Sequence, residues 1–188
     1  MNVNHDKNLE IATLGGGCFW CVEAVYQELN GVKKVISGYS GGHVKNPSYK
    51  AVTTGTTGHA EVVQVHFDPE VVSFEEVLDV FFRTHNPTTL NRQGADVGTQ
   101  YRSVIFFHDE VQQQIAEAAK QAAQAAEYWP DPFVTEISPF TEFYKAEDYH
   151  QDYYSLNSRQ GYCVYVIQPK LEKFRKEFKD RLKKQKAN

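Results

Sequence analysis

The sequence has only three cysteines in 188 residues, which is too few, and an odd number, for the disulfide framework of a small secreted protein. Long apolar runs are absent too: no stretch approaches the roughly 20 apolar residues of a membrane span, and the amino end, MNVNHDKNLE, is polar. The formal net charge of −4 provides no general attraction to nucleic acid or to an anionic membrane. We therefore expect a cytoplasmic protein that binds neither nucleic acid nor membrane, and whose cysteines serve metal binding or thiol chemistry.

What the chain does contain is enough apolar sequence, 41% of its residues, to bury a core in one domain. Strand and helix patterns alternate irregularly, no repeat period is visible and no linker divides the chain. This organisation predicts a single α+β domain over residues 1–188. We expect its core over about 10–175 and a basic amphipathic helix over about 170–184, where LEKFRKEFKDRL carries an apolar stripe.

Local patterns indicate where the elements begin and end. Ser73 and Glu76 form an S-x-x-E capping box at the start of one helix, and Asp109 can cap another. The segment 86–100 is long and irregular, and such loops inside a compact domain are usually functional. The aromatic segment 140–154 is predicted to be helical. Periodicity predicts strands at 9–14, within 32–42, within 60–69, at 101–108 and at 134–138, and helices at 18–31, 73–85, 109–128 and 171–182.

The stretch GGGCFWCVE (15–23) places Cys18 between a glycine turn and the start of a helix. Unpaired backbone N–H groups and the positive end of the helix dipole favour thiolate over thiol at that position. The glycines allow a sharp turn and leave the approach to the sulfur open. Cys18 is therefore a candidate nucleophile. The alternative is a small buried hydrophobic residue, as most free cysteines are.

Cys21 completes a C-x-x-C pair, which has three possible meanings: a thioredoxin-like redox pair, half of a zinc site, or one working thiol with a neighbour. The zinc interpretation is weak because a closed site needs four ligands, and only Cys163 and scattered histidines remain to complete it. Between the two cysteines, Phe19 and Trp20 either form an apolar wall for a small group beside the sulfur or belong to the core.

A carboxyl group is expected on the inward face of one strand. In AEVVQVHFDP, Glu61 shares its parity with Val63, Val65 and Phe67, so strand geometry points it towards the more apolar face. Lost hydration raises the pKa of such a carboxyl group and suits it to general acid catalysis. The alternative is a salt bridge, for example to Arg102.

Two tyrosines and three histidines add further candidates. Tyr49 and Tyr101 stand beside loop segments, and tyrosine hydroxyls can donate to an oxygen that gains negative charge. His59, His85 and His150 could instead supply a base to the thiol, as in a cysteine hydrolase. A non-catalytic peptide-binding domain with the same aromatic pocket is a third class.

These stretches resemble one family, the A-type peptide methionine sulfoxide reductases, which act on the S epimer of the sulfoxide. The glycine-cysteine-phenylalanine-tryptophan signature of that family stands here as GGGCFWCVE. The resemblance continues in the same order through GYSGG, NPSYKAVTTGTTGHAEVVQVHFDP, FFRTHNPTTLNRQGADVGTQYRS and AEDYHQDYYSLNSRQGYCVYVIQPK. The fold we expect is a two-layer sandwich with a mixed, largely antiparallel sheet, flanking helices and a ferredoxin-like core.

The resemblance implies a role for each candidate residue. Cys18 attacks the sulfoxide sulfur and becomes a sulfenic acid as methionine leaves. Glu61, helped by the two tyrosines named above, protonates the departing oxygen. Phe19 and Trp20 hold the substrate methyl group, and Asp96 shapes the pocket. No metal or organic cofactor is implied, and the activity would repair oxidised proteins and reduce the free sulfoxide.

The resemblance also implies that a second cysteine resolves the sulfenic acid and that thioredoxin reduces the resulting disulfide. Cys163, in GYC, stands at a usual resolving position of the family. Cys21 replaces the commonest glycine of the signature and lies one helical turn from Cys18. We expect a disulfide from Cys18 to one of these two, with Cys163 preferred. The glycine-rich tail with a further cysteine, common in the family, is replaced here by VIQPKLEKF and a helix.

Overall fold

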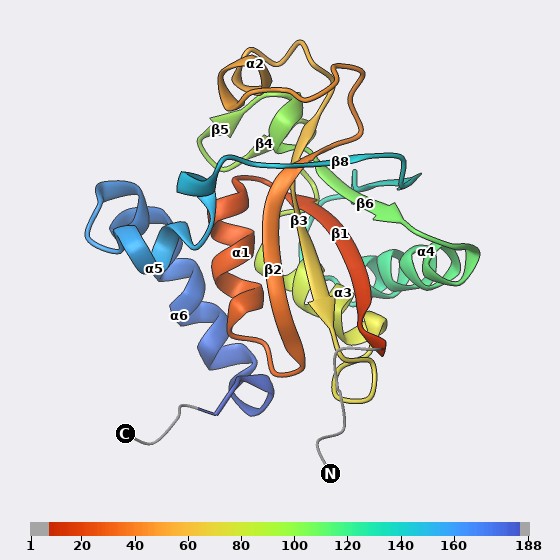
Figure 1. Cartoon of the computed structure of the whole chain (residues 1–188). Helices are drawn as coiled ribbons and strands as arrows, with labels where there is room; N and C mark the ends of the chain where they lie inside the picture. Colours follow the sequence, from red (N-terminus) through yellow and green to blue (C-terminus); the bar gives the residue numbers. More distant parts are fainter. Residues whose placement is uncertain (1–7, 185–188) are drawn as a thin grey trace.

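The computed structural model describes residues 8–184, in which one curled sheet runs through the molecule (Figure 1). Its six strands are β1 (Glu10–Gly16), β2 (Val32–Ser40), β3 (Ala60–Phe67), β6 (Ser103–Phe107), β7 (Glu136–Pro139) and β8 (Phe143–Lys145). The order is β7-β6-β1-β3-β2-β8, and every pair is antiparallel except β6 with β7. The α+β class and the mixed, largely antiparallel sheet are confirmed, while the ferredoxin-like core stays a prediction.

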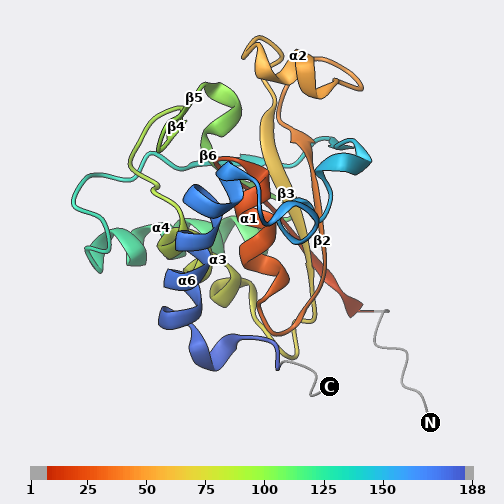
Figure 2. The same cartoon turned by 90° about the vertical axis from the view of Figure 1, so that its left-hand side faces the viewer.

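Helices gather on one side of the sheet. The longer ones are α1 (Phe19–Gln27), α3 (Phe74–Thr84), α4 (Glu110–Ala125) and α6 (Gln168–Glu177), with short helices α2 (Tyr49–Thr53) and α5 (Tyr153–Asn157). Figure 2 shows the four longer helices on the same side of β2 and β3. No helix within residues 8–184 is both long and apolar enough to cross a lipid bilayer.

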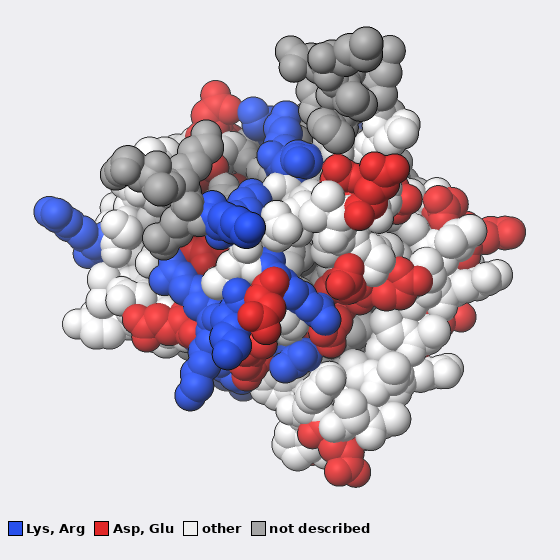
Figure 3. Space-filling view, turned by 90° about the horizontal axis from the view of Figure 1, so that it is seen from below, with Lys and Arg blue, Asp and Glu red and all other residues white. Residues whose placement is uncertain are grey.

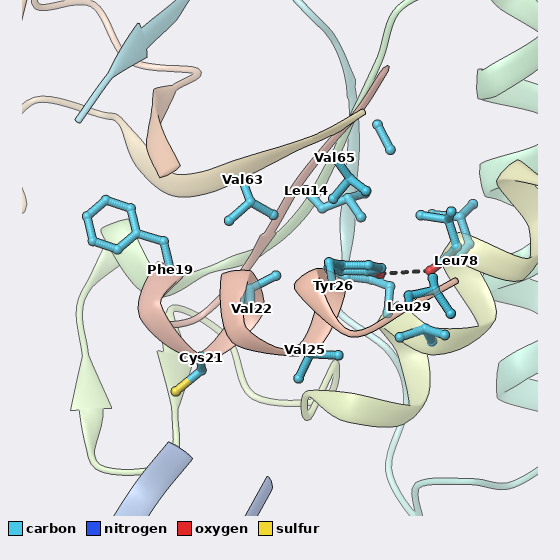
Figure 4. Packing of buried hydrophobic residues seen from close by; sticks show 14 of the residues in the cluster. Leu14, Phe19, Cys21, Val22, Val25, Tyr26, Leu29, Val63, Val65 and Leu78 are labelled. Carbon is cyan, nitrogen blue, oxygen red and sulfur yellow. Dashed lines mark hydrogen bonds between the residues drawn. The ribbon is translucent and has the colours of Figure 1, made fainter. Parts of the chain in front are cut away.

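The main core lies between α1 and the centre of the sheet. Val22 and Tyr26 of α1 face Leu14 of β1 and Val63 of β3, as Figure 4 shows. The Tyr26 hydroxyl is fully buried and donates to the carbonyl of Val77 on α3 at 2.8 Å, so its polar atom is satisfied. Burying each large apolar side chain contributes about 1.5–3 kcal/mol. This packing fixes α1, and therefore the thiol at its start, against the sheet.

The opposite face of the sheet is covered by the chain between β7 and β8. Phe140 and Phe143 pack there against a second apolar cluster of Ala60, Val62, Val104 and Phe106. β3 is therefore buried on both faces along nearly its whole length. The inward position predicted for Glu61 is confirmed, since only 2% of its surface is exposed.

Two predicted helix starts are confirmed by their capping bonds. The Ser73 hydroxyl accepts from the backbone N–H of Glu76, and the Glu76 side chain accepts from the backbone of Ser73, which completes a capping box. Asp109 accepts from the backbone N–H of Gln112 at 2.8 Å and begins α4. These local rules place the start of both helices at the residue that the sequence predicts.

The helix predicted over 140–154 is wrong. The chain there forms β8, a 3-10 turn (Asp148–His150) and then α5. Residues 38–40 of β2 offer an open edge, and pairing with this edge replaces helical bonds. Asp152, at φ +54°, lies in the left-handed region and interrupts any continuous helix. Tertiary pairing therefore overrides the local pattern of this segment.

The segment 86–100, expected to be irregular, contains a small hairpin. Its strands are β4 (Arg92–Gln93) and β5 (Asp96–Val97), followed by a 3-10 turn (Thr99–Tyr101). This hairpin lies above the start of α1 in Figure 1. It brings a carboxylate and a tyrosine, far from Cys18 in the sequence, to the amino-terminal end of α1.

The basic carboxyl-terminal helix is shorter than predicted. Leu171, Phe174 and Phe178 are buried, which confirms the apolar stripe, but α6 ends at Glu177 because Phe178 leaves the helical conformation. Arg175 then makes two bonds to Glu28 at the end of α1. Seen from below (Figure 3), Lys and Arg side chains gather in the middle of this face with Asp and Glu among them. The helix is docked on the domain.

Candidate active site

A tight turn between β1 and α1 positions Cys18. Gly17 has φ +95°, a backbone conformation that L side chains rarely adopt, and a Cβ atom there would lie 2.5 Å from the Gln93 side chain. The carbonyl of Cys18 accepts from the backbone N–H of Cys21 at 3.1 Å, which begins the helix. Cys18 is buried, with 8% of its surface exposed.

The thiols of Cys18 and Cys21 interact, and their pKa values shift in opposite directions. Burial, and then the bond to Cys21, raises the pKa of Cys18 well above its ordinary value. The bond from Cys18, helped by the positive charge of Lys170, lowers the pKa of Cys21 to about 7. The side chain of Cys18 makes no capping bond to the helix. The opposite directions of these two shifts make Cys21 the more acidic thiol of the pair, while the nucleophilic role expected of Cys18 stays a prediction.

Glu61 provides a buried carboxyl group without a full set of partners. Burial, and then the charges of Asp96 and Cys21, raises its pKa well above the ordinary value. Its Oε2 atom has no hydrogen-bond partner among the described residues. The alternative salt bridge is not formed, because Arg102 pairs with Glu136 at 3.0 Å. The raised pKa therefore favours the protonated form of Glu61.

Tyr49 and Tyr101 share this electrostatic environment. Burial, and then the charges of Glu61 and Cys18, raises the pKa of Tyr49 to about 12. Burial and the charge of Glu61 likewise raise the pKa of Tyr101. The structure thus brings together four residues that the sequence separates, with both phenols held in their protonated, donating form.

Aromatic rings surround Trp20, the residue after Phe19 in α1. The indole stacks on Tyr153 with ring centres 3.6 Å apart and planes 5° apart, and its Nε1–H donates to Nδ1 of His150 at 3.0 Å. Trp20 stays partly exposed, whereas Phe19 is 1% exposed and packs near the rings of Tyr39 and His150. Trp20 is the accessible apolar wall, and Phe19 is a core residue beneath it.

Sequence reasoning missed Tyr153 and Tyr162, and it gave His150 the role of a base and not that of a partner of Trp20. The Tyr162 hydroxyl donates to Asp96 at 2.8 Å and lies 3.8 Å from the sulfur of Cys21. Together with Tyr153 and His150, it comes from the aromatic carboxyl-terminal third of the chain. The unusual density of tyrosine around AEDYHQDYY was the available signal, but only the fold shows which rings face Trp20.

Cys163 is the most completely buried of the three cysteines. It begins a π-helical turn (Cys163–Ile167) and has 0% exposed surface. Burial raises its pKa, and the charge of Cys21 raises it further, so Cys163 lies within the electrostatic reach of Cys21. All three cysteines are free thiols in this structure.

None of the three candidate histidines acts on the thiol pair. His59 and His85 bond to backbone carbonyls, and His85 also bonds to the hydroxyl of Ser103 at 2.7 Å. His150 accepts from Trp20. Within residues 8–184 no histidine hydrogen-bonds to a cysteine, so the arrangement of a cysteine hydrolase is not formed.

Two interacting thiols beside a buried carboxyl with a raised pKa form the kind of site at which a thiol can take an oxygen atom from a substrate. This chemistry defines the class as a thiol-dependent oxidoreductase of α+β fold. A family model described as peptide methionine sulfoxide reductase matches residues 10–182. The chain therefore belongs to the peptide methionine sulfoxide reductase family, in its A type.

Individual relatives agree with the family model over most of their length. The chain is 57% identical to peptide methionine sulfoxide reductase MsrA of Polynucleobacter asymbioticus, over 95% of this chain and 96% of the relative. It is 55% identical to the MsrA of Saccharolobus solfataricus, over 93% and 98% of the two chains. Among solved structures it resembles reduced Mxr1 of Saccharomyces cerevisiae, with a TM-score of 0.79 and 38% identity over 84% of this chain and 91% of that chain.

Proposed function

We propose that this protein reduces the S epimer of methionine sulfoxide, free and in proteins, through a sulfenic acid on Cys18 and a disulfide that thioredoxin reduces. The observation that carries the proposal is the contrast between a protonated, incompletely bonded carboxyl, Glu61, and the thiol pair at the start of α1. Glu61 can donate a proton, and the thiol pair can donate an electron pair. Family membership supplies the substrate class.

In the first step Cys18 attacks the sulfoxide sulfur while its proton moves to the thiolate of Cys21. Glu61 gives its proton to the departing oxygen, and the Tyr49 and Tyr101 hydroxyls donate to the same oxygen as it gains charge. Oxygen ends on Cys18 as a sulfenic acid, methionine leaves, and the substrate sulfur is reduced by two electrons. The raised pKa values of Glu61 and of both tyrosines support these roles.

The substrate methyl group has an apolar surface available beside the sulfur. Trp20 offers a partly exposed indole held in place by Tyr153 and His150, and Phe19 supports it from the core. Asp96 accepts from Tyr162 and so closes the polar side of the site. We infer that Trp20 binds the methyl group and that Asp96 orients the tyrosine beside the thiols.

In the second step a thiol attacks the sulfenic sulfur and expels water, which leaves a disulfide. The interaction with Cys18 that lowers the pKa of Cys21 supports Cys21 as the resolving residue, since it requires the two thiols to be close neighbours at the start of α1. Cys163 has no such contact and no exposed surface. We therefore favour Cys21 over Cys163, which could exchange with Cys21 afterwards. Mxr1 of Saccharomyces cerevisiae has been solved in complex with Trx2, which supports thioredoxin as the reductant here.

Counting thiols before and after one equivalent of S-sulfoxide tests the proposal. Wild type should release one methionine and lose two thiols, and peptide mass mapping should place the disulfide between Cys18 and Cys21. Cys18→Ser should release no methionine, whereas Cys21→Ser should release one and retain a sulfenic acid that a dimedone probe captures. Full turnover by Cys18→Ser would refute the assigned nucleophile, and reduction of the R epimer would refute the assigned stereochemistry.

A further inference from the structure

One face of α1 holds a distant segment of the chain. Trp20, Glu23 and Gln27 are spaced by three and four residues, so they lie on the same side of the helix. All three contact residues 147–153: Trp20 through His150 and Tyr153, Glu23 through the Tyr153 backbone, and Gln27 through Asp152. The face that presents the aromatic wall therefore also anchors the segment that supports this wall.

Glu23 is the buried centre of this contact, with 1% of its surface exposed. One carboxylate oxygen accepts from the backbone N–H of Tyr153 at 3.2 Å. The other accepts from the hydroxyl of Ser37, on β2, at 3.1 Å. A buried carboxylate is costly unless it is hydrogen-bonded, so these bonds determine where the carboxylate can lie. Glu23 thus ties α1, β2 and the start of α5 together.

The same segment is fastened to β2 by a second set of bonds. The Gln151 side chain donates to the carbonyl of Ser37 at 2.9 Å and accepts from its N–H at 3.0 Å, as a strand neighbour would. Gln27 donates to Asp152 at 2.6 Å, at the residue in the left-handed region. These bonds hold an otherwise irregular segment in one conformation.

The segment supports two parts of the proposed site. Its Tyr153 and His150 hold the indole of Trp20 by stacking and by a hydrogen bond. Its Glu147 accepts from the backbone N–H of Tyr49 at 3.0 Å, which fixes the start of α2. A shift of the segment would therefore move both the apolar wall and one phenol.

We propose that Glu23 is a positioning residue: by fixing the backbone of residues 152 and 153, it sets the orientation of Trp20 for substrate binding. This inference rests on the proposed function, because it assigns Trp20 to the substrate methyl group. Glu23 itself does not touch the reacting atoms. Since Trp20 binds substrate and transition state alike, its misplacement raises KM and leaves kcat nearly unchanged.

The test uses Trp20 as its own reporter. The sequence has two tryptophans, and Trp129, whose indole donates to the carbonyl of Phe82, lies away from this site. In a Trp129→Phe background, Glu23→Ala should shift the Trp20 emission to longer wavelength and increase its quenching by acrylamide. The same variant should raise KM for a sulfoxide peptide roughly tenfold. A tenfold change corresponds to a free energy of the size contributed by one or two hydrogen bonds.

Two further variants separate positioning from general destabilisation. Glu23→Gln keeps an acceptor for Tyr153 and a donor for Ser37, so it should restore both emission and KM. Val25→Ala, on the opposite face of α1 and buried at 1% exposure, should lower the melting temperature without changing either readout. Should Glu23→Ala fail to fold, Ser37→Ala removes one of the two carboxylate bonds and should give a smaller change in the same direction.

Three results would overturn the inference: wild-type emission and KM in Glu23→Ala, no rescue by Glu23→Gln, or an equal rise in KM for Val25→Ala. The emission measurements need no substrate. If wild type did not reduce the sulfoxide, the proposed function would fail, while the emission would still report whether Glu23 holds Trp20.

Discussion

Two carboxyl groups in this protein are equally buried but have opposite surroundings. Glu61 on β3 is 2% exposed and Glu23 on α1 is 1% exposed. One oxygen of Glu61 lacks a partner among the described residues, whereas both oxygens of Glu23 accept hydrogen bonds. The bonds to Glu23 lower its pKa and so limit the rise caused by burial to about 7, whereas burial and two neighbouring charges raise the pKa of Glu61 well above its ordinary value. The partners of a buried carboxyl, more than its burial, indicate its role.

Removing the proton of Glu61 should have the largest effect. Glu61→Gln keeps the shape of the side chain but cannot donate a carboxyl proton, so the single-turnover rate of methionine release should fall by ~10²–10⁴. Rapid-quench measurement with S-sulfoxide checks this rate. Glu23→Gln is the matched control, equally buried and expected to keep the wild-type rate. An unchanged rate in Glu61→Gln would contradict the difference drawn between the two carboxyls.

Glu23 should instead appear in the pH dependence of stability. Burial raises its pKa from 4.5 to about 7. Between these two pH values the folded protein keeps this carboxyl protonated, whereas the unfolded chain has lost the proton. Its contribution to the free energy of unfolding should therefore fall as pH rises from 4.5 towards 7, by about 3 kcal/mol at ~1.4 kcal/mol per pKa unit. Glu23→Gln should remove this slope in urea denaturation series. An identical slope in the variant would show that Glu23 titrates normally.

The two phenols should contribute less than the acid they assist. Tyr49→Phe and Tyr101→Phe each remove one donor to the departing oxygen, which should lower kcat/KM by roughly tenfold. Tyr128→Phe is a suitable control, because Tyr128 is 47% exposed and lies outside the site. Steady-state kinetics with a sulfoxide peptide measure all three. An equal loss in the control would remove the distinction between tyrosines near Glu61 and tyrosines elsewhere.

Cys163→Ser should have the smallest effect, with no change in the first turnover. Its side chain is sealed from solvent and makes no hydrogen bond to Cys18, so it should not take part in methionine release. The Cys21 thiolate, with a pKa of about 7, can be followed by its ultraviolet absorbance. This absorbance should persist in Cys163→Ser and disappear in Cys21→Ser. A slower first turnover in Cys163→Ser would mean that this thiol reaches the substrate side of the site.

Much of the fold could be predicted because the signals are local. Capping residues located α3 and α4, strand parity turned Glu61 inward, and an apolar stripe docked α6. The segment 140–154 could not be predicted, because its conformation depends on the open edge of β2 and on bonds to Glu23 and Gln27. The local composition of the segment indicates neither the strand edge nor these bonds.

The candidate site shows the same division. The residue types and local patterns at Cys18, Glu61 and the two tyrosines are sufficient to predict a thiol and an acid from the sequence alone. The lowered pKa of Cys21 could not be predicted, because it depends on the interaction with Cys18 and, to a smaller extent, on the charge of Lys170 from α6. Position along the helix does not reveal the burial of Cys18, which is the largest cause of its raised pKa.

The turn before Cys18 has a consequence for which substitutions the chain tolerates. Gly17 lies against the side chain of Gln93, and the amide of Gln93 makes two bonds to the backbone of Asn86. Any larger residue at 17 would expel Gln93 and free Asn86, in addition to straining the turn. Gly94 also has a positive φ, +58°, but a Cβ atom there meets nothing within 4 Å. In a saturation mutagenesis screen, codon 17 should accept glycine alone, whereas codon 94 should accept asparagine or aspartate with little loss.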